Sequence, residues 1–165
     1  MKVLQKIANC KGFSLLESMA ALLIISILTV GITTGVNAAS KIYQQSLFVS
    51  EGDILAATVD TALSDVLRFS SEISEEDGVV SFTNANYSVK KGHLLSESGW
   101  LYLNLRGEED APLVLLLNNG VYSSMEINSF QLSYAEGVFS GSYEIKSKKD
   151  DTLVKKYAFH FRTLS

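Results

Sequence analysis

The sequence contains very little cysteine and very little proline. Of its 165 residues, one is a cysteine, Cys10, and one is a proline, Pro112. Residues 13–165 can therefore form no disulfide among themselves, which excludes a small secreted scaffold held by disulfides. A single proline also excludes collagen-like and proline-rich chains. The length fits one modest domain with an appendage, and stability must come from packing.

Positive charge is also scarce. The formal net charge is −4, and the first twelve residues contain Lys2, Lys6 and Lys11 but no acidic residue. Without those three lysines the charge becomes −7. A net acidic chain is a poor general DNA binder, because contacts with phosphates need a cationic surface.

Charged residues are absent altogether from residues 18–40. This run of 23 mostly apolar residues is long enough to cross the hydrocarbon core of a bilayer, which takes about 20 helical residues. The lysines precede the run, so the positive-inside bias places the N-terminus in the cytoplasm. Everything after about Lys41 is then expected outside the cytoplasm.

Three interpretations of this N-terminal segment compete. It is a plain single-pass anchor, a secretory signal cut near residues 36–39, or a signal cut after Gly12 that keeps the apolar run. Glu17 helps to separate them, because a carboxylate inside a spanning helix costs roughly 2.5–3.5 kcal/mol and usually has a partner. A cut after Gly12 creates a new α-amine on Phe13, near Glu17 in the sequence. The amine of one subunit can then pair with Glu17 of its neighbour in an assembly.

The same residues carry a resemblance to a known family. A basic leader, Gly12, Phe13, a small polar residue, two leucines, Glu17 and an apolar helix follow one another, and this order resembles the class III signal of type IV pilins and pseudopilins. The resemblance implies that a membrane prepilin peptidase cuts after Gly12 and methylates the amine of Phe13. It also implies that Glu17 serves register and assembly, and that the helix packs in the centre of a helical filament.

Two glycines and a missing proline distinguish the apolar helix. Gly31 and Gly35 form a G-x-x-x-G step, a spacing that lets membrane helices approach closely. Glycine also weakens a helix outside lipid. The pair is therefore either a packing face within the membrane or a weak point of the helix outside it. Many members of the family carry a helix-kinking proline in this region, where Thr33 and Thr34 stand here. That departure favours a minor pilin or pseudopilin over a major pilin.

After the apolar run, the sequence predicts the rest of a long helix. Apolar residues recur at helical spacing to about Arg68, with a weak point at Gly52, and this stripe is expected to pack on its own domain. The stripe consists of Ile42, Val49, Ala56, Val59, Leu63 and Val66. The expected segments are a cleaved leader at 1–12, a transmembrane or filament-core helix at 13–40, an amphipathic helix at 41–70 and a β head domain at 71–165.

The remaining residues predict a polar linker at 70–78 and then strands separated by turns. The expected strands are residues 79–83, 86–90, 100–106, 113–117, 121–125, 129–134, 142–146 and 153–162. Turns are expected at Lys91-Gly92 and at Asn119-Gly120, the second a strong hairpin signal. Short connections favour antiparallel pairing. The fold class is therefore α+β, with a long N-terminal helix packed on an antiparallel sheet.

The head domain shows no motif that points to catalysis. His93 and His160 are the two histidines, and His160 alternates with aromatic residues on the last strand, which indicates a surface strand residue. No nucleophile elbow, zinc-binding helix, C-x-x-C or phosphate loop is present in the sequence. The sequence thus predicts no enzyme, no cofactor, no catalytic or metal-binding residues and no small-molecule substrate.

Two kinds of charge cluster are candidate binding sites. The acidic clusters, which could supply calcium ligands, are residues 75–77, 108–110 and 150–151. The lysines, which could hold DNA phosphates, are Lys146, Lys148, Lys149, Lys155 and Lys156. Solvated loops carry acidic clusters routinely, and Asp150 and Asp151 lie among the lysines. The favoured interpretation of the lysines is a charged strand edge that discourages aggregation, so DNA is a possible but not a favoured partner.

The sequence thus predicts a structural subunit, a minor pilin or pseudopilin of a type IV pilus, a type II secretion filament or a DNA-uptake filament. Its expected partners are other pilins or pseudopilins, the prepilin peptidase and the cytoplasmic membrane, and its final place is an extracellular filament at the cell surface. The alternative is an extracytoplasmic binding module that does not assemble. A secreted form of that module begins near Ala39, and an anchored form begins at Met1.

Overall fold

The computed structural model describes residues 15–108, 110–122 and 124–164, apart from the side chains of residues 119 and 122. The chain divides into two compact units, residues 1–44 and 45–165. The α-helix α1 (Leu15–Arg68) begins in the first unit and ends in the second. The strands all belong to residues 45–165, called the C-terminal unit below.

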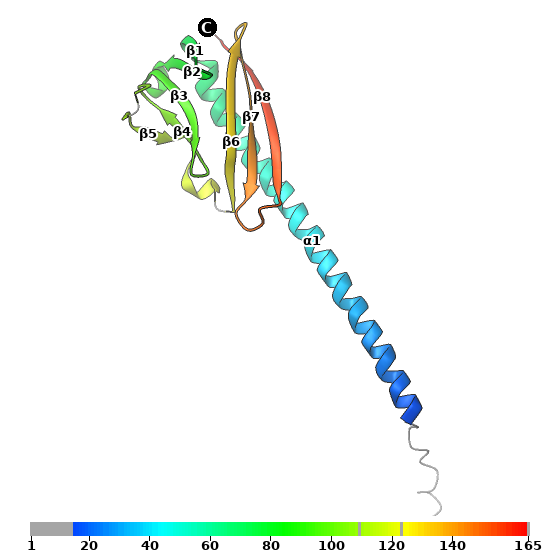
Figure 1. Ribbon diagram of the computed structural model, residues 1–165. Coiled ribbons are helices and arrows are strands. Elements are labelled where there is room, and N and C mark those ends of the chain that lie inside the picture. Colours follow the sequence, from blue (N-terminus) through cyan, green and yellow to red (C-terminus); the bar gives the residue numbers. More distant parts are fainter. Residues whose placement is uncertain (1–14, 109, 123, 165) are drawn as a thin grey trace, which may run out of the picture. The chain divides into compact units, whose positions relative to one another are not determined.

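The described strands form two antiparallel sheets (Figure 1). The first sheet has the order β1 (Ser71–Glu76), β2 (Val79–Asn84), β3 (Val89–Glu97), β4 (Trp100–Asn104) and β5 (Leu113–Leu115). The second has the order β6 (Met125–Ala135), β7 (Val138–Ser147) and β8 (Val154–Arg162). Two short 3₁₀ helices lie between strands, η2 (Ala85–Tyr87) between β2 and β3 and η3 (Asn119–Tyr122) between β5 and β6. Neighbouring strands in each order are consecutive in the chain, so short turns connect most of them.

The core of the C-terminal unit lies between the second part of α1 and both sheets. Val59 and Leu63 of α1 are fully buried, as are Phe82 of β2 and Phe139 of β7. The rings of Phe82 and Phe139 meet edge to face with centroids 6.3 Å apart, which joins the two sheets. Burying each such side chain contributes roughly 1.5–3 kcal/mol. One face of the helix therefore holds the two sheets together.

The C-terminal end of α1 has its backbone carbonyls satisfied by neighbouring groups. The fully buried Asn84 donates from its side-chain amide to the Val66 carbonyl oxygen at 2.6 Å. The Ser70 hydroxyl donates to the same carbonyl at 2.8 Å. The backbone N–H of Leu164, beyond β8, donates to the Arg68 carbonyl at 2.9 Å. These bonds replace the intrahelical partners that the last turn lacks, so the helix ends where the sequence predicted.

The α+β class, the long helix and the antiparallel pairing are confirmed. Four members of the expected stripe, Ala56, Val59, Leu63 and Val66, are buried, whereas Ile42 and Val49 are 65% and 38% exposed.

The expected weak point at Gly52 is wrong, because α1 continues through it and Gly52 is buried. A Cβ at this position would lie 3.2 Å from the Tyr157 hydroxyl. The glycine therefore lets β8 approach the helix.

Several local predictions in the strand region are also wrong. The polar linker at 70–78 is strand β1 and its turn, with Asp77 and Gly78 at positive φ of 52° and 77°. The expected strand at 86–90 begins in η2, and only its last two residues, Val89 and Lys90, lie in β3. The expected turn at Lys91-Gly92 lies inside β3. The expected strand at 121–125 is the end of η3 and the first residue of β6. Asn119-Gly120 begins η3 and makes no hairpin, because its flanking segments pair with other strands.

Candidate functional site

The N-terminal end of α1 holds one of the predicted assembly residues. Glu17 lies in the first turn of the helix that begins at Leu15. An acidic side chain is favoured there, because the first turn carries the positive end of the helix dipole. Gly12 and Phe13, the predicted processing residues, lie outside the described residues. The roles of all three residues stay predictions.

The first part of α1 is mostly apolar all round and has no charged residue from residue 18 to residue 40. Residues 15–47 are all exposed, and the large apolar side chains Leu15, Leu22, Ile25 and Ile32 are 81%, 65%, 58% and 67% exposed. A helix that is apolar all round is stable when lipid or other helices surround it. By length and composition, α1 can cross a membrane. Its N-terminal part is thus consistent with membrane anchoring.

Four hydroxyl groups of this segment are hydrogen-bonded within the helix. The hydroxyls of Ser26, Thr29, Thr33 and Thr34 each donate to the carbonyl four residues earlier, at 2.7–2.8 Å. A hydroxyl in hydrocarbon needs such a partner, because moving a polar group there from water without a hydrogen bond costs roughly 2–7 kcal/mol. The four hydroxyls therefore do not prevent the segment from lying in lipid or in a bundle of apolar helices.

Gly31 and Gly35, the predicted packing residues, lie one helical turn apart in α1. Apart from its chain neighbours and the backbone of the adjacent helical turns, a Cβ built at either position has no described atom of this chain within 4 Å. The helix surface at the two glycines is therefore open, and the spacing puts both on one face. Such a face admits the backbone of another helix closely. The role of the two glycines in helix packing stays a prediction.

Comparison with known proteins identifies the same segment. The prokaryotic N-terminal methylation motif matches residues 7–33. The chain carries a type IV pilin-like prepilin signal. The matched range includes Gly12, Phe13, Glu17 and Gly31 and ends before Gly35. Searches of curated proteins and of solved structures found no significant match. The prepilin signal implies processing by a prepilin peptidase and assembly with other pilins.

The C-terminal unit contains a cleft that the sequence did not predict. It has a volume of about 800 Å³ and lies where β2, β3, β6 and β7 meet, and His93 and His160 both line it. The ring Nδ1 of His160 lies 3.0 Å from the hydroxyl of Ser140, which is directly opposite it on β7. Partial burial lowers the pKa of His93. The two histidines come from strands of different sheets, His93 from β3 and His160 from β8, and no local pattern in the sequence signals that both line one cleft.

The lysines near the C-terminus are largely engaged with neighbouring groups. Lys146 pairs with Asp151 at 2.9 Å, and Lys155 pairs with Asp53 of α1 at 2.6 Å. The ammonium of Lys148 lies 5.4 Å from the centre of the Trp100 ring. The hydrogen bonds with these acids raise the pKa of Lys146 and of Lys155.

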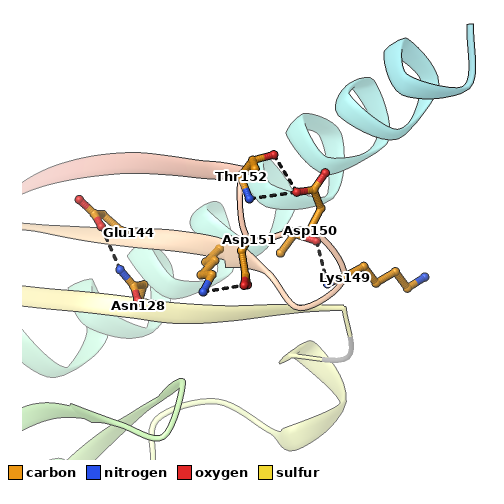
Figure 2. Close-up of polar contacts among 8 residues, drawn as sticks. Asn128, Glu144, Lys149, Asp150, Asp151 and Thr152 are labelled. Carbon is orange, nitrogen blue, oxygen red and sulfur yellow. Dashed lines mark hydrogen bonds and ion pairs between the residues drawn. The ribbon is translucent and has the colours of Figure 1, made fainter. Parts of the chain in front are cut away.

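Asp150 holds the turn between β7 and β8 (Figure 2). Its carboxylate accepts hydrogen bonds from the backbone N–H and the hydroxyl of Thr152, at 2.9 and 2.7 Å. Asp151 lies beside it, paired with Lys146. Both acids therefore lie among the lysines at positions 146–156, called the lysine cluster below, and reduce the positive field of this cluster. Within the part of the chain that the structure covers, no group of three or more His, Cys, Asp or Glu residues is placed to hold a metal ion.

Proposed function

We propose that this chain is a structural subunit, a minor pilin or pseudopilin, of a filament built from pilin-like proteins. The prepilin signal at residues 7–33 supports the proposal most strongly. The apolar first part of α1 supports it as well, because this surface needs lipid before assembly and neighbouring helices after it. The filament serves a type IV pilus, a type II secretion system or DNA uptake.

The processing step assigns roles to Gly12, Phe13 and Glu17. A prepilin peptidase cuts after Gly12 and methylates the new amine of Phe13, and the leader of residues 1–12 stays behind. The positive amine of Phe13 in one subunit pairs with the Glu17 carboxylate of a neighbour. In a low-dielectric filament core this pairing sets the register between helices, because breaking a buried ion pair leaves an uncompensated charge.

The C-terminal unit faces outward in this proposal, and it works by contact and not by catalysis. The motif marks a pilin-type structural protein. The pairing of Lys146 and Lys155 with acids argues against a DNA-binding role for the lysine cluster.

Mass spectrometry of the N-terminal peptide of the native protein tests the proposal. The expected peptide starts at Phe13 and carries one added methyl group. A peptide that starts at Met1 contradicts the proposal and supports a plain anchor. A start near Ala39 contradicts it equally and supports a secreted binding module.

A further inference from the structure

Each of the two sheets has one edge strand rich in charged residues and one with a single charged residue or none. The edge strands are β1 and β5 in the first sheet and β6 and β8 in the second. The charged edge residues are Glu72, Glu75 and Glu76 on β1, and Lys155, Lys156 and Arg162 on β8. In contrast, β5 has no charged residue, and β6 has none from Ile127 to Ala135. Charged side chains protect an edge from pairing with another strand, so β5 and β6 are the unprotected edges.

Among the described contacts, the edge of β6 that faces away from β7 is hydrogen-bonded to other elements near both of its ends. Its middle is called the open part of the edge below. The backbone N–H of Ile127 donates to the Gly99 carbonyl at 3.0 Å. Near the other end, the N–H of Tyr134 donates to the Glu75 carboxylate at 3.2 Å and so points away from β7. Alternate residues of a strand direct their backbone groups to the same side, so Phe130 and Leu132 also point away from β7. In the part of the chain that the structure describes, no backbone hydrogen bond links these two residues to β2 or β3.

The open part of β6 borders the cleft that His93 and His160 line. None of the described residues lining the cleft is an aspartate, glutamate, lysine or arginine. Its walls combine apolar side chains such as Val79 and Leu95 with short polar ones such as Ser140. A cleft of about 800 Å³ lies within the range of roughly 300–1,000 Å³ that is typical of binding pockets. A surface of this kind fits an uncharged, extended segment of chain.

The strand β5 has the properties of such a segment. It pairs with β4 on one side, and its other side is the edge of the sheet. Leu113 and Val114 are 40% and 47% exposed, so two apolar side chains of this edge lie in contact with solvent. Residues 111–125 contain no charged residue.

We propose that the open edge of β6 receives β5 of a second copy of this chain by strand addition. Main-chain hydrogen bonds to Phe130 and Leu132 supply the pairing, and the uncharged walls of the cleft accept the apolar side chains of β5. The contact joins two different surfaces, so it is heterologous and repeats from copy to copy. It goes beyond the proposed function, because it concerns the C-terminal units and not the helices.

Cross-linking between two cysteine variants of the full-length chain tests the contact. Both variants carry Cys10→Ser, which removes the chain's single cysteine. One also carries Val114→Cys and the other Gln131→Cys, and they are expressed together in the producing cell and treated with a short bis-maleimide. The expected product is a mixed dimer, about tenfold more abundant than the dimer of either variant alone, because the two positions meet only across the proposed contact.

Two further variants serve as controls. Lys156→Cys, on β8 and outside the cleft, replaces Gln131→Cys and is expected to give only background cross-linking with Val114→Cys. Adding Leu113→Lys to the Val114→Cys variant places a charge on the β5 edge and is expected to reduce the mixed dimer about tenfold. Circular dichroism of this variant in detergent, matching that of its parent, verifies that it is folded.

Three outcomes overturn the proposal. The first is a dimer of the Val114→Cys variant alone as abundant as the mixed dimer, which indicates β5 pairing with β5. The second is a mixed dimer that survives Leu113→Lys unchanged. The third is cross-linking at the background level in a strain where the N-terminal peptide starts at methylated Phe13. In that third case the proposed function stands while the strand contact fails, so the two proposals fail separately.

Discussion

The hydroxyl of Tyr143 lies 2.8 Å from a carboxylate oxygen of Asp60, and this contact links β7 to α1 across the core. The same hydroxyl lies 3.0 Å from the carbonyl oxygen of Ala56, so one proton faces two acceptors. Burial, together with the Asp60 carboxylate, raises the pKa of Tyr143, which keeps this hydroxyl protonated. Burial also raises the pKa of Asp60, and the hydrogen bond from Tyr143 opposes that change.

Tyr143→Phe removes the only hydrogen of this contact and leaves both acceptors in place. We expect a loss of about 1.5–3 kcal/mol in the free energy of unfolding, the range for a hydrogen bond to a charged group. Urea unfolding of the full-length chain in detergent measures it. Tyr102→Phe is the matched control, because Tyr102 is half-buried and its hydroxyl makes no hydrogen bond among the described contacts. Equal midpoints for Tyr143→Phe and wild type would contradict the role given to the contact.

Asp53 makes stability depend on pH in the acid range. Its carboxylate accepts hydrogen bonds from the Lys155 ammonium at 2.6 Å and the Tyr157 hydroxyl at 2.8 Å. The bond from Lys155 first, and then that from Tyr157, lowers the pKa of Asp53 below its ordinary 3.8. A carboxyl whose pKa is lower in the folded chain adds stability above its unfolded pKa, and this is lost as the pH falls through the folded pKa.

Asp53→Asn is therefore expected to lower the melting temperature at pH 7 and to have progressively less effect as the pH falls below about 4. Melting curves of both proteins between pH 7 and pH 2.5 measure the difference. Asp65→Asn is the control, because Asp65 is exposed on the same helix and belongs to neither of the two described ion pairs. A difference between Asp53→Asn and wild type that stays constant over the whole range would refute the assignment.

Gly92 lets β3 and β4 approach where a side chain cannot fit. A Cβ there would collide with the carbonyl oxygen of Asn104 and lie 2.6 Å from Cγ1 of Val89. Gly92→Ala is expected to reduce the free energy of unfolding by about 2–3 kcal/mol, because backbone atoms must shift. Gly120→Ala is the control, since the nearest atom to its Cβ is 3.7 Å away. Urea midpoints of the two variants measure the contrast. Equal midpoints would show that the backbone of β4 shifts without a loss in the free energy of unfolding.

The long elements were predictable because their signals are local. The periodic burial of Ala56, Val59, Leu63 and Val66 follows from helical spacing, and α1 ends at Arg68 as expected. The prepilin signal is likewise a contiguous pattern, and the methylation motif matches it.

The errors come from strands whose residues are polar or whose turns are not local. β1 has one half-buried residue, Ile73, in a strand otherwise exposed, so it has no apolar alternation to read. The dipeptide Asp77-Gly78, expected as the end of a polar linker, forms the turn of the β1–β2 hairpin with both residues at positive φ. The cleft between the sheets had no local signal at all, because His93 and His160 are brought there by separate strands.

Glu17 is expected to act in assembly and not in processing. Glu17→Ala keeps Gly12 and Phe13, so the peptidase should still cut and methylate the chain. Filaments should take up the variant roughly tenfold less than wild type, because the Phe13 amine of the neighbour then lacks a partner in an apolar setting. Quantitative mass spectrometry of sheared filaments and of the membrane fraction measures both steps at once.

The control for this variant is Ser18→Ala, which changes the adjacent side chain without removing a charge. It should be processed and assembled as wild type. Accumulation of unprocessed Glu17→Ala chain in the membrane would place Glu17 in recognition by the peptidase. Equal amounts of Glu17→Ala and wild-type chain in filaments would remove the carboxylate from the assembly mechanism altogether, because a residue that costs roughly 2.5–3.5 kcal/mol to insert would then gain nothing from a neighbouring subunit.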